Sequence, residues 1–184
     1  SGWRERKLEP DDRQLQRAGL APLHFNAMTW DPNAAAKCRD AGFRSTTTYN
    51  ITSTGKTSAG LTQEYEDLIS CHVAAWKAMG ETALPHCPVV TMGWDVTPRC
   101  GHDVPFPFAK PDYPYCHVVV GNTPERFGRL CRLAAAHAAA DPKRPPAVLV
   151  NAWNEWTEGS YLLPEEKYGN AYLEALKAAF AAGR

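Results

Sequence analysis

The sequence of 184 residues has no excess of either charge and no long hydrophobic run. Its 20 lysine and arginine residues balance 20 aspartate and glutamate residues, whereas nucleic-acid-binding domains usually carry a basic excess. No run of about 18 apolar residues occurs, so no transmembrane helix is predicted, and the polar opening SGWRERK is unlike a signal peptide. We therefore expect one soluble domain over residues 1–184, cytoplasmic or secreted, with no nucleic-acid partner and no membrane span.

Several short motifs are also missing. The six cysteines stand singly, with no CxxC or CxxxC spacing, so free thiols are favoured over disulfides, and a metal site is favoured least. No GxGxxG and no GxxxxGK[ST] follows an expected strand, which removes the usual dinucleotide-binding and P-loop interpretations. No metal is therefore expected.

Strand and helix patterns alternate four times along the chain. Short apolar or threonine-rich runs between turn residues indicate strands, and apolar residues at helical spacing between capping residues indicate helices. Strands are expected at Pro22–Met28, Phe43–Asn50, Pro88–Asp95 and Ala147–Trp156, followed by helices at about 31–41, 62–79, 123–140 and 164–182. This α/β alternation is typical of a parallel sheet with outer helices, either doubly wound or part of a (β/α)8 barrel.

Side-chain alternation within three of these strands gathers polar residues on one face. In the last strand one face is apolar and should contact helices, with Val148, Val150 and Ala152, while the other carries Leu149, Asn151, Trp153 and Glu155. The same parity groups Thr91 with Gly93 and Asp95 in the third strand, and His24 with Asn26 in the first. We expect the polar faces to share one interior, with chemistry at the carboxyl ends of the strands.

The segment NAWNEWTEG, residues 151–159, is the strongest candidate for chemistry. Glu155 and Glu158 lie at the end of an expected buried strand, where two carboxylates suit general acid and base work on a glycosidic bond. Gly159 permits a turn that would face both toward one cleft. Alternatively, Glu158 is a solvated or helix-capping residue. Trp153 and Trp156 are either core residues or platforms for sugar rings.

Two motifs carry a resemblance to a known family. The segment NAWNEWTEGSYLLPEEKYGNAYLEAL resembles the C-terminal motif of the glycoside hydrolase family 99-like proteins, including the WbsX group of bacterial polysaccharide-locus proteins. Within it, residues 154–159 are similar to the NEWxEG segment of family 99 endo-α-mannosidases. Upstream, GWDVTPR at residues 93–99 resembles the GWDNTxR segment of the WbsX group. The similarity covers about residues 88–176.

The resemblance implies a (β/α)8 barrel and a retaining glycoside hydrolase that acts on an α-linked glycan without a cofactor. Glu155 would be the base that assists the sugar's 2-hydroxyl in attacking the anomeric carbon. Glu158 would be the acid, and then the base, at the leaving oxygen. Two alternatives remain: a glycosyltransferase-like protein of surface-polysaccharide biosynthesis, and a glycan-binding barrel fragment without catalysis.

Further residues at the strand ends are expected to bind an oligosaccharide or polysaccharide. They are Trp94, Asp95, Arg99, Trp153, Asn154, Trp156, His24 and Tyr49. A structural Asp95–Arg99 pair and a buried His24 in the core are the plainer alternatives. The loop at 96–122 is rich in proline and aromatic residues, so we expect either a glycan groove or packing over the barrel rim.

Four βα units are half of what an eight-stranded barrel needs, because such barrels take about 250 residues. The chain is therefore expected to be the C-terminal half of a TIM barrel. The edges of a half-barrel sheet would be left unpaired. We expect them to be covered by the N-terminal half of the barrel or by a second copy of the chain.

Overall fold

The computed structural model describes residues 12–52, 62–101, 103 and 117–181. Its four central strands are parallel: β1 (Asn26–Met28) pairs with β2 (Ser45–Thr47), and β4 (Val89–Thr91) pairs with β6 (Leu149–Asn151). A parallel bridge between Thr46 and His86, just before β4, links the two pairs. Its two hydrogen bonds run from Thr46 N to Pro85 O (2.9 Å) and from Cys87 N to Thr46 O (2.8 Å). The strands therefore follow one another in the order of the sequence.

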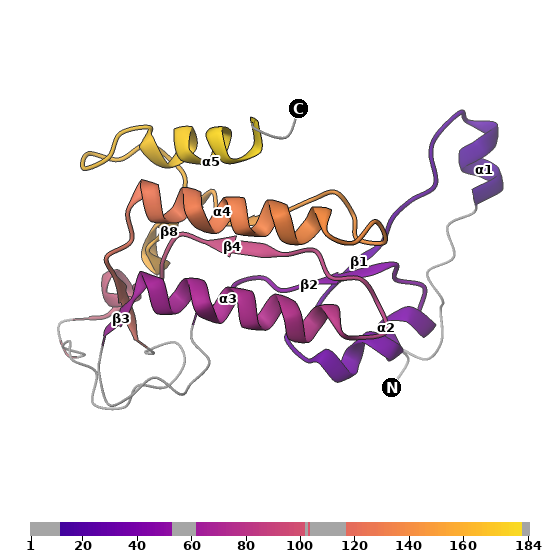
Figure 1. Cartoon of the computed structure of the whole chain (residues 1–184), viewed down its shortest axis with the longest axis horizontal. Helices are drawn as coiled ribbons and strands as arrows, with labels where there is room; N and C mark the ends of the chain where they lie inside the picture. Colours follow the sequence, from indigo (N-terminus) through magenta and orange to yellow (C-terminus); the bar gives the residue numbers. More distant parts are fainter. Residues whose placement is uncertain (1–11, 53–61, 102, 104–116, 182–184) are drawn as a thin grey trace.

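Three long helices cover the strands on one side. In Figure 1, α3 (Tyr65–Gly80), α4 (Pro124–Ala139) and α5 (Ala171–Ala181) lie side by side, and α4 packs against both of the others. The short α2 (Ala35–Asp40) connects β1 to β2. The helix α1 (Asp12–Arg17) projects away from the other helices and strands (Figure 1). Each crossover between neighbouring central strands thus contains a helix, as parallel pairing requires.

The start of α4 shows why a helix forms at that place. Thr123 has extended backbone, and its hydroxyl accepts a hydrogen bond from Arg126 N (3.4 Å). Pro124 follows in the first turn, where its missing N–H leaves no intrahelical bond unmade. Phe127 and Leu130 then fall at helical spacing and are fully buried. Cap, proline and apolar spacing therefore all favour the same helix start.

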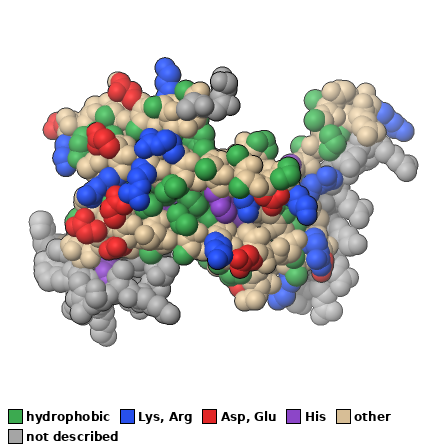
Figure 2. All heavy atoms as spheres, in the orientation of Figure 1, with side chains coloured by type: hydrophobic (Ala, Val, Ile, Leu, Met, Phe, Trp, Pro, Cys, Tyr) green, Lys and Arg blue, Asp and Glu red, His purple; other side chains and the backbone are tan. Residues whose placement is uncertain are grey.

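The core lies around β4, which is buried on both faces. Val89 and Val90 are 1% and 0% exposed, although successive side chains of a strand point to opposite sides. Two α3 side chains bind the β4 backbone: Trp76 Nε1 donates to Val89 O (3.1 Å), and the Tyr65 hydroxyl donates to Thr91 O (2.8 Å). Figure 2 shows hydrophobic side chains gathered between α3 and α4, with charged side chains around them.

All four central strands lie where the sequence predicts strands, but each has three residues and is shorter than expected. Two further strands pair in parallel: β3 (Thr62–Glu64) and β5 (Val118–Val120). β3 occupies the expected start of a helix, and β5 lies inside the expected loop at 96–122. The expected last strand ends at Asn151 and is followed by a hairpin of β7 (Asn154–Glu155) and β8 (Ser160–Tyr161). Long-range pairing, which periodicity does not report, is the physical reason for these differences.

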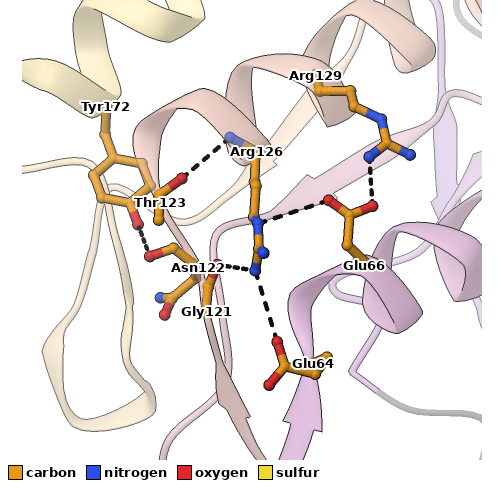
Figure 3. Close-up of polar contacts among 8 residues, drawn as sticks. All are labelled: Glu64, Glu66, Gly121, Asn122, Thr123, Arg126, Arg129 and Tyr172. Atoms are coloured by element: carbon orange, nitrogen blue, oxygen red, sulfur yellow. Dashed lines mark hydrogen bonds and ion pairs between the residues drawn. The ribbon is translucent and has the colours of Figure 1, made fainter.

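An arginine holds the β3–β5 pair to the beginning of α4 (Figure 3). Arg126 Nη1 donates to Gly121 O (2.7 Å), at the end of β5, and lies 3.7 Å from Glu64 Oε2, at the end of β3. Arg126 Nε lies 3.7 Å from Glu66 in the first turn of α3, and Glu66 also pairs with Arg129. Each exposed ion pair contributes little alone, but together they connect three elements at one end of the sheet.

The apolar face predicted for the last strand contacts helices as expected. Val148 and Val150 line a pocket of about 740 Å³ together with residues of α4 and α5. The five cysteines within the described residues, at 38, 71, 87, 100 and 131, are free thiols. Within the same residues, no helix is long and apolar enough to cross a membrane.

Two histidines, His72 and His86, are fully buried. His72 Nδ1 donates to Leu68 O (2.8 Å), and His86 Nδ1 lies 3.2 Å from the Thr46 hydroxyl. The Nε2 atoms of both have no hydrogen-bond partner within the described part of the chain. Burial lowers the pKa of His72 to about 4, and burial together with the charges of His137 and Arg144 lowers the pKa of His86 to about 4. Both are therefore neutral at pH 7.

Acid should destabilise the fold before its carboxylates are protonated. The unfolded chain takes up protons at the ordinary histidine pKa of about 6.5, whereas folded His72 and His86 stay neutral down to about pH 4. The unfolded state therefore binds more protons in this window, and the free energy of unfolding falls as the pH drops, by up to roughly 3 kcal/mol for each histidine.

Urea titrations across this pH range measure the effect. His72→Gln should flatten the pH dependence, whereas Lys37→Gln, at an exposed position that does not titrate in this range, should leave it unchanged. Equal slopes in both variants would contradict the assignment.

Candidate active site

The carboxyl ends of β2, β4 and β6 converge on one edge of the molecule. Tyr49 follows β2, Asp95 follows β4, and the β7–β8 hairpin follows β6. Asp95 N donates to Glu158 O (2.8 Å), and Ile51 N lies 3.4 Å from the Thr91 hydroxyl, so these three chain segments are in direct contact. The residues predicted at the ends of three separate strands are thereby brought together.

The hairpin is held in place at both of its ends. A short 3-10 helix, Trp156–Glu158, connects its two strands and ends at Gly159, whose φ of 62° is left-handed. Ser160 Oγ donates to Asn151 O (2.6 Å), and Leu162 N donates to Trp153 O (3.0 Å). Ser160 is also the strand partner of Glu155. Asn151 thus contacts the strand partner of Glu155.

Glu155 is half-buried and lies close to Tyr49. The Tyr49 hydroxyl donates to Glu155 Oε1 at 3.4 Å, a long hydrogen bond. Burial raises the pKa of Tyr49, and the charges of Glu155 and Glu158 raise it further. The phenol is thus in contact with Glu155 and within electrostatic reach of both carboxylates.

Glu158 is nearly buried, and its two oxygens differ. Arg99 Nη2 donates to Glu158 Oε1 (2.8 Å), and Arg99 Nε donates to the Thr157 hydroxyl (3.1 Å). Glu158 Oε2 is buried and has no hydrogen-bond partner among the described residues. A buried carboxylate oxygen without a partner is costly, so this atom is a candidate contact for a substrate.

Aromatic side chains surround the two carboxylates with much of their surface exposed. The exposed fractions are 55% for Trp153, 44% for Trp156 and 37% for Tyr49, and Asn154 is exposed as well. Exposed apolar side chains that gather in one place often mark a binding site. They can stack on the apolar faces of sugar rings.

The sequence analysis missed Trp30, which follows β1 at the same end of the strands. Its ring is 59% exposed, and Trp30 Nε1 donates to Asn50 O (3.0 Å). An aromatic residue directly after a strand and before Asp31-Pro32 was the available signal. Parity drew attention to His24 and Asn26 instead.

Two of the predicted positions are wrong. His24 is exposed and precedes β1, so it lies at the amino end of the strands; its Nε2 is 2.7 Å from the Ser45 hydroxyl, at the start of β2. The strand was expected to begin at Pro22 but begins at Asn26. His24 therefore precedes the strand instead of lying within it. Trp94 is 1% exposed in the core and offers no ring surface to a sugar, because both faces of the chain after β4 are covered.

Asp95 and Arg99 do not form a structural ion pair with each other, which was the alternative to sugar binding. Asp95 Oδ1 accepts hydrogen bonds from Thr97 N (2.9 Å) and the Thr97 hydroxyl (2.6 Å), which caps the turn at 97–99. Arg99 pairs with Glu158 instead.

The aromatic residues of the 96–122 loop, Phe106, Phe108, Tyr113 and Tyr115, lie outside the described residues. Within the described ones, no group of three or more metal-ligating side chains is present.

Parallel βα units with carboxylates at the strand ends define the class: part of a (β/α)8 barrel with its candidate site at the carboxyl edge. Residues 9–176 match the family model described as "Glycosyltransferase WbsX". The chain belongs to this carbohydrate-active family, and the half-barrel fold expected from the sequence is confirmed.

The relatives are much longer proteins or share only the fold. The uncharacterized protein WxcX of Xanthomonas campestris pv. campestris, from strain B100 and a second strain, is 32% identical over 93 residues, which cover 50% of this chain and 12% of that protein. A solved structure of the family 99 endo-α-mannosidase from Bacteroides thetaiotaomicron is similar, with a TM-score of 0.52 and 15% identity. The match covers 88% of this chain and 43% of that one.

Gly159 should be required for the position of Glu158. A Cβ at Gly159 would lie 2.8 Å from Asp95 Cβ and 3.0 Å from Asp95 N, whereas a Cβ at Gly169, also left-handed, meets nothing within 4 Å. We expect Gly169→Ala to cost only the backbone term, about 1 kcal/mol. Gly159→Ala should cost at least about 2 kcal/mol more. Urea unfolding of both variants measures the difference, and equal losses would contradict a close approach of Gly159 to β4.

Proposed function

We propose that this chain supplies the catalytic edge of a retaining glycoside hydrolase that acts on an α-linked glycan, in the manner of an endo-mannosidase. The observation that supports this best is the placement of Glu155 and Glu158 on one hairpin at the carboxyl edge, both within electrostatic reach of Tyr49. The family membership and the barrel fold point to the same class of substrate.

In the proposed reaction Glu155 takes the proton of the sugar's 2-hydroxyl, whose oxygen attacks the anomeric carbon. The glycosidic C–O bond breaks as Glu158 gives its proton to the leaving oxygen. Water then attacks the anomeric carbon and the bond between this carbon and the 2-oxygen breaks, while Glu158 takes the water's proton and Glu155 returns its proton to the 2-oxygen. Two inversions give overall retention, and neither glutamate forms an ester with the sugar, unlike the commoner retaining scheme.

The contact with Arg99 sets a condition on this role. A guanidinium that donates to a carboxylate favours its charged form, while an acid must carry a proton. Glu158 Oε2 has no partner in the described part of the chain, so that oxygen is the one proposed to carry the proton. We propose that substrate binding draws Arg99 from Glu158 toward the sugar hydroxyls.

The exposed aromatic and polar residues of this edge are the proposed walls of the glycan site. Trp153 and Trp156 would stack on sugar rings, and Trp30 and Tyr49 would extend the surface across β1 and β2. Asn154, which is exposed, would supply hydrogen bonds from its amide. Asp95 has one oxygen engaged by Thr97.

A complete barrel is part of the proposal. β1 and β6 each have one strand partner among the described strands, so each leaves one edge unpaired. The other half of a barrel, or a second copy of the chain, would cover these edges and close the site. Turnover is therefore expected from the polypeptide that carries this chain within a complete barrel.

Conversion of either glutamate to its amide should abolish turnover without loss of binding. Glu155→Gln and Glu158→Gln should each lower kcat by about 100-fold or more, because each removes a proton-transfer group. Glu166→Gln, at an exposed position outside the hairpin, is the matched control. Product release from a fluorescently labelled α-mannan oligosaccharide measures kcat, and calorimetry measures affinity.

The same assay separates the alternatives. Glycan binding without turnover in the unaltered protein, and unchanged affinity in Glu155→Gln, would establish a binding module instead. The name of the matched family favours transfer as the second candidate. Transfer predicts that an added sugar acceptor takes up the cleaved glycan in place of water.

A further inference from the structure

A separate polar pocket lies behind the hairpin. It has a volume of about 190 Å³ and lies between Met92 after β4, Asn122 before α4, Gly159 of the hairpin, and Tyr172 in the first turn of α5. Glu155, Glu158 and Tyr49 do not line it. At about 30 Å³ per water it holds roughly six waters, and it is smaller than the 300–1,000 Å³ typical of sites for drug-sized ligands. Its size suits one six-membered ring.

One wall of this pocket is a preformed turn at residues 165–169. Glu165 Oε2 accepts a hydrogen bond from Lys167 N (2.7 Å), and Glu165 Oε1 accepts one from Tyr168 N (2.6 Å). Gly169 N donates to Glu165 O (2.8 Å), which closes the turn. Because these bonds exist without a ligand, binding would require little ordering of this wall.

The aromatic part of the lining is also held by contacts within the protein. The Tyr172 hydroxyl donates to Asn122 O (3.0 Å), and Tyr168 meets Tyr172 edge to face at 5.7 Å between ring centres. Burial raises the pKa of Tyr161 and of Tyr172, and the charge of Glu165 raises both further. Tyr161, Tyr168, Tyr172 and Glu165 all line this one pocket.

The pocket is connected to the candidate active site through stacked rings. Tyr161 lines the pocket and lies against Trp156, with ring centres 4.1 Å apart and planes at 30°. Trp156 is in turn exposed at the carboxyl edge. A glycan bound along that edge would thus have the pocket beside it.

The charges and polar groups of the pocket select a neutral ligand. Glu165 and Lys167 carry opposite charges, so neither an anion nor a cation meets a field of one sign. Lys167 Nζ also lies 4.7 Å from the centre of the Tyr168 ring, in a cation–π contact. Hydroxyl, ammonium and carboxylate groups together offer donors and acceptors, and the tyrosines offer ring faces.

We propose that this pocket is a side subsite that binds one neutral sugar residue, such as a branch of a glycan held at the hairpin. Its use as a branch subsite rests on the proposed function. Sugar binding to the pocket itself is independent of Glu155 and Glu158.

The test is a titration of the ¹⁵N-labelled 184-residue chain with methyl α-D-mannopyranoside, followed by amide NMR. The amides of residues 159–172 should shift. Lys167→Met, which replaces an exposed residue, should weaken this binding about tenfold, because a charged hydrogen-bond donor is lost. The matched control, Lys177→Met, replaces an exposed lysine of α5 outside the pocket. It should bind as the unaltered chain does, and so should Glu155→Gln.

Three results would overturn the proposal: no shift in residues 159–172, equal affinity in Lys167→Met and Lys177→Met, or tighter binding of inorganic phosphate than of the glycoside. Shifts confined to Trp30, Tyr49 and Trp153 would place the sugar at the carboxyl edge alone and count against the pocket. Glycoside binding to the pocket, together with no turnover by the complete barrel that carries this chain, would refute the proposed catalysis only. Turnover without these shifts would refute the side subsite only.

Discussion

The backbone hydrogen bond from Asp95 N to Glu158 O joins the hairpin to the segment that follows the buried strand β4. The rest of the candidate site depends on it, because the hairpin has only two residues in each of its strands and is not stable alone. Gly159 makes the approach possible by its left-handed backbone and its missing side chain. The position of the two carboxylates is thereby fixed relative to β4, whose backbone is held by hydrogen bonds from Tyr65 and Trp76 of α3.

Much of the fold followed from local patterns, and the errors arose where distant segments meet. Four strands and three long helices could be located from periodicity and caps. The pairing of β3 with β5 could not, because it joins residues 62–64 to residues 118–120 and neither segment is long enough to carry a pattern. His24 was placed at the wrong end of the sheet because β1 begins at Asn26 rather than at Pro22. Trp94 is buried because the chain after β4 is covered on both faces, a feature that alternation within one strand does not reveal.

Within the candidate site, the residue types were predictable and their partners were not. The two glutamates and the neighbouring tryptophans are concentrated in nine residues, so sequence alone drew attention to them. Whether Arg99 would bind Asp95, Glu158 or a sugar depends on a turn of the chain that brings residue 99 beside residue 158. The two carboxylates now have different surroundings, a phenol for Glu155 and a guanidinium for Glu158. Such differences are how paired acids take different tasks.

The parallel pairing of β3 with β5 has a consequence for the way this family can change over time. The two strands belong to the connections that follow β2 and β4, so these connections share a ladder of backbone hydrogen bonds. In most barrels such connections diversify separately, which is how one scaffold serves many reactions. Here, a one-residue insertion in either connection would shift the register between β3 and β5. The side chains of the altered strand would then point to the opposite face of the pair. The two connections should therefore vary as one unit, with Arg126 as the residue that keeps them aligned.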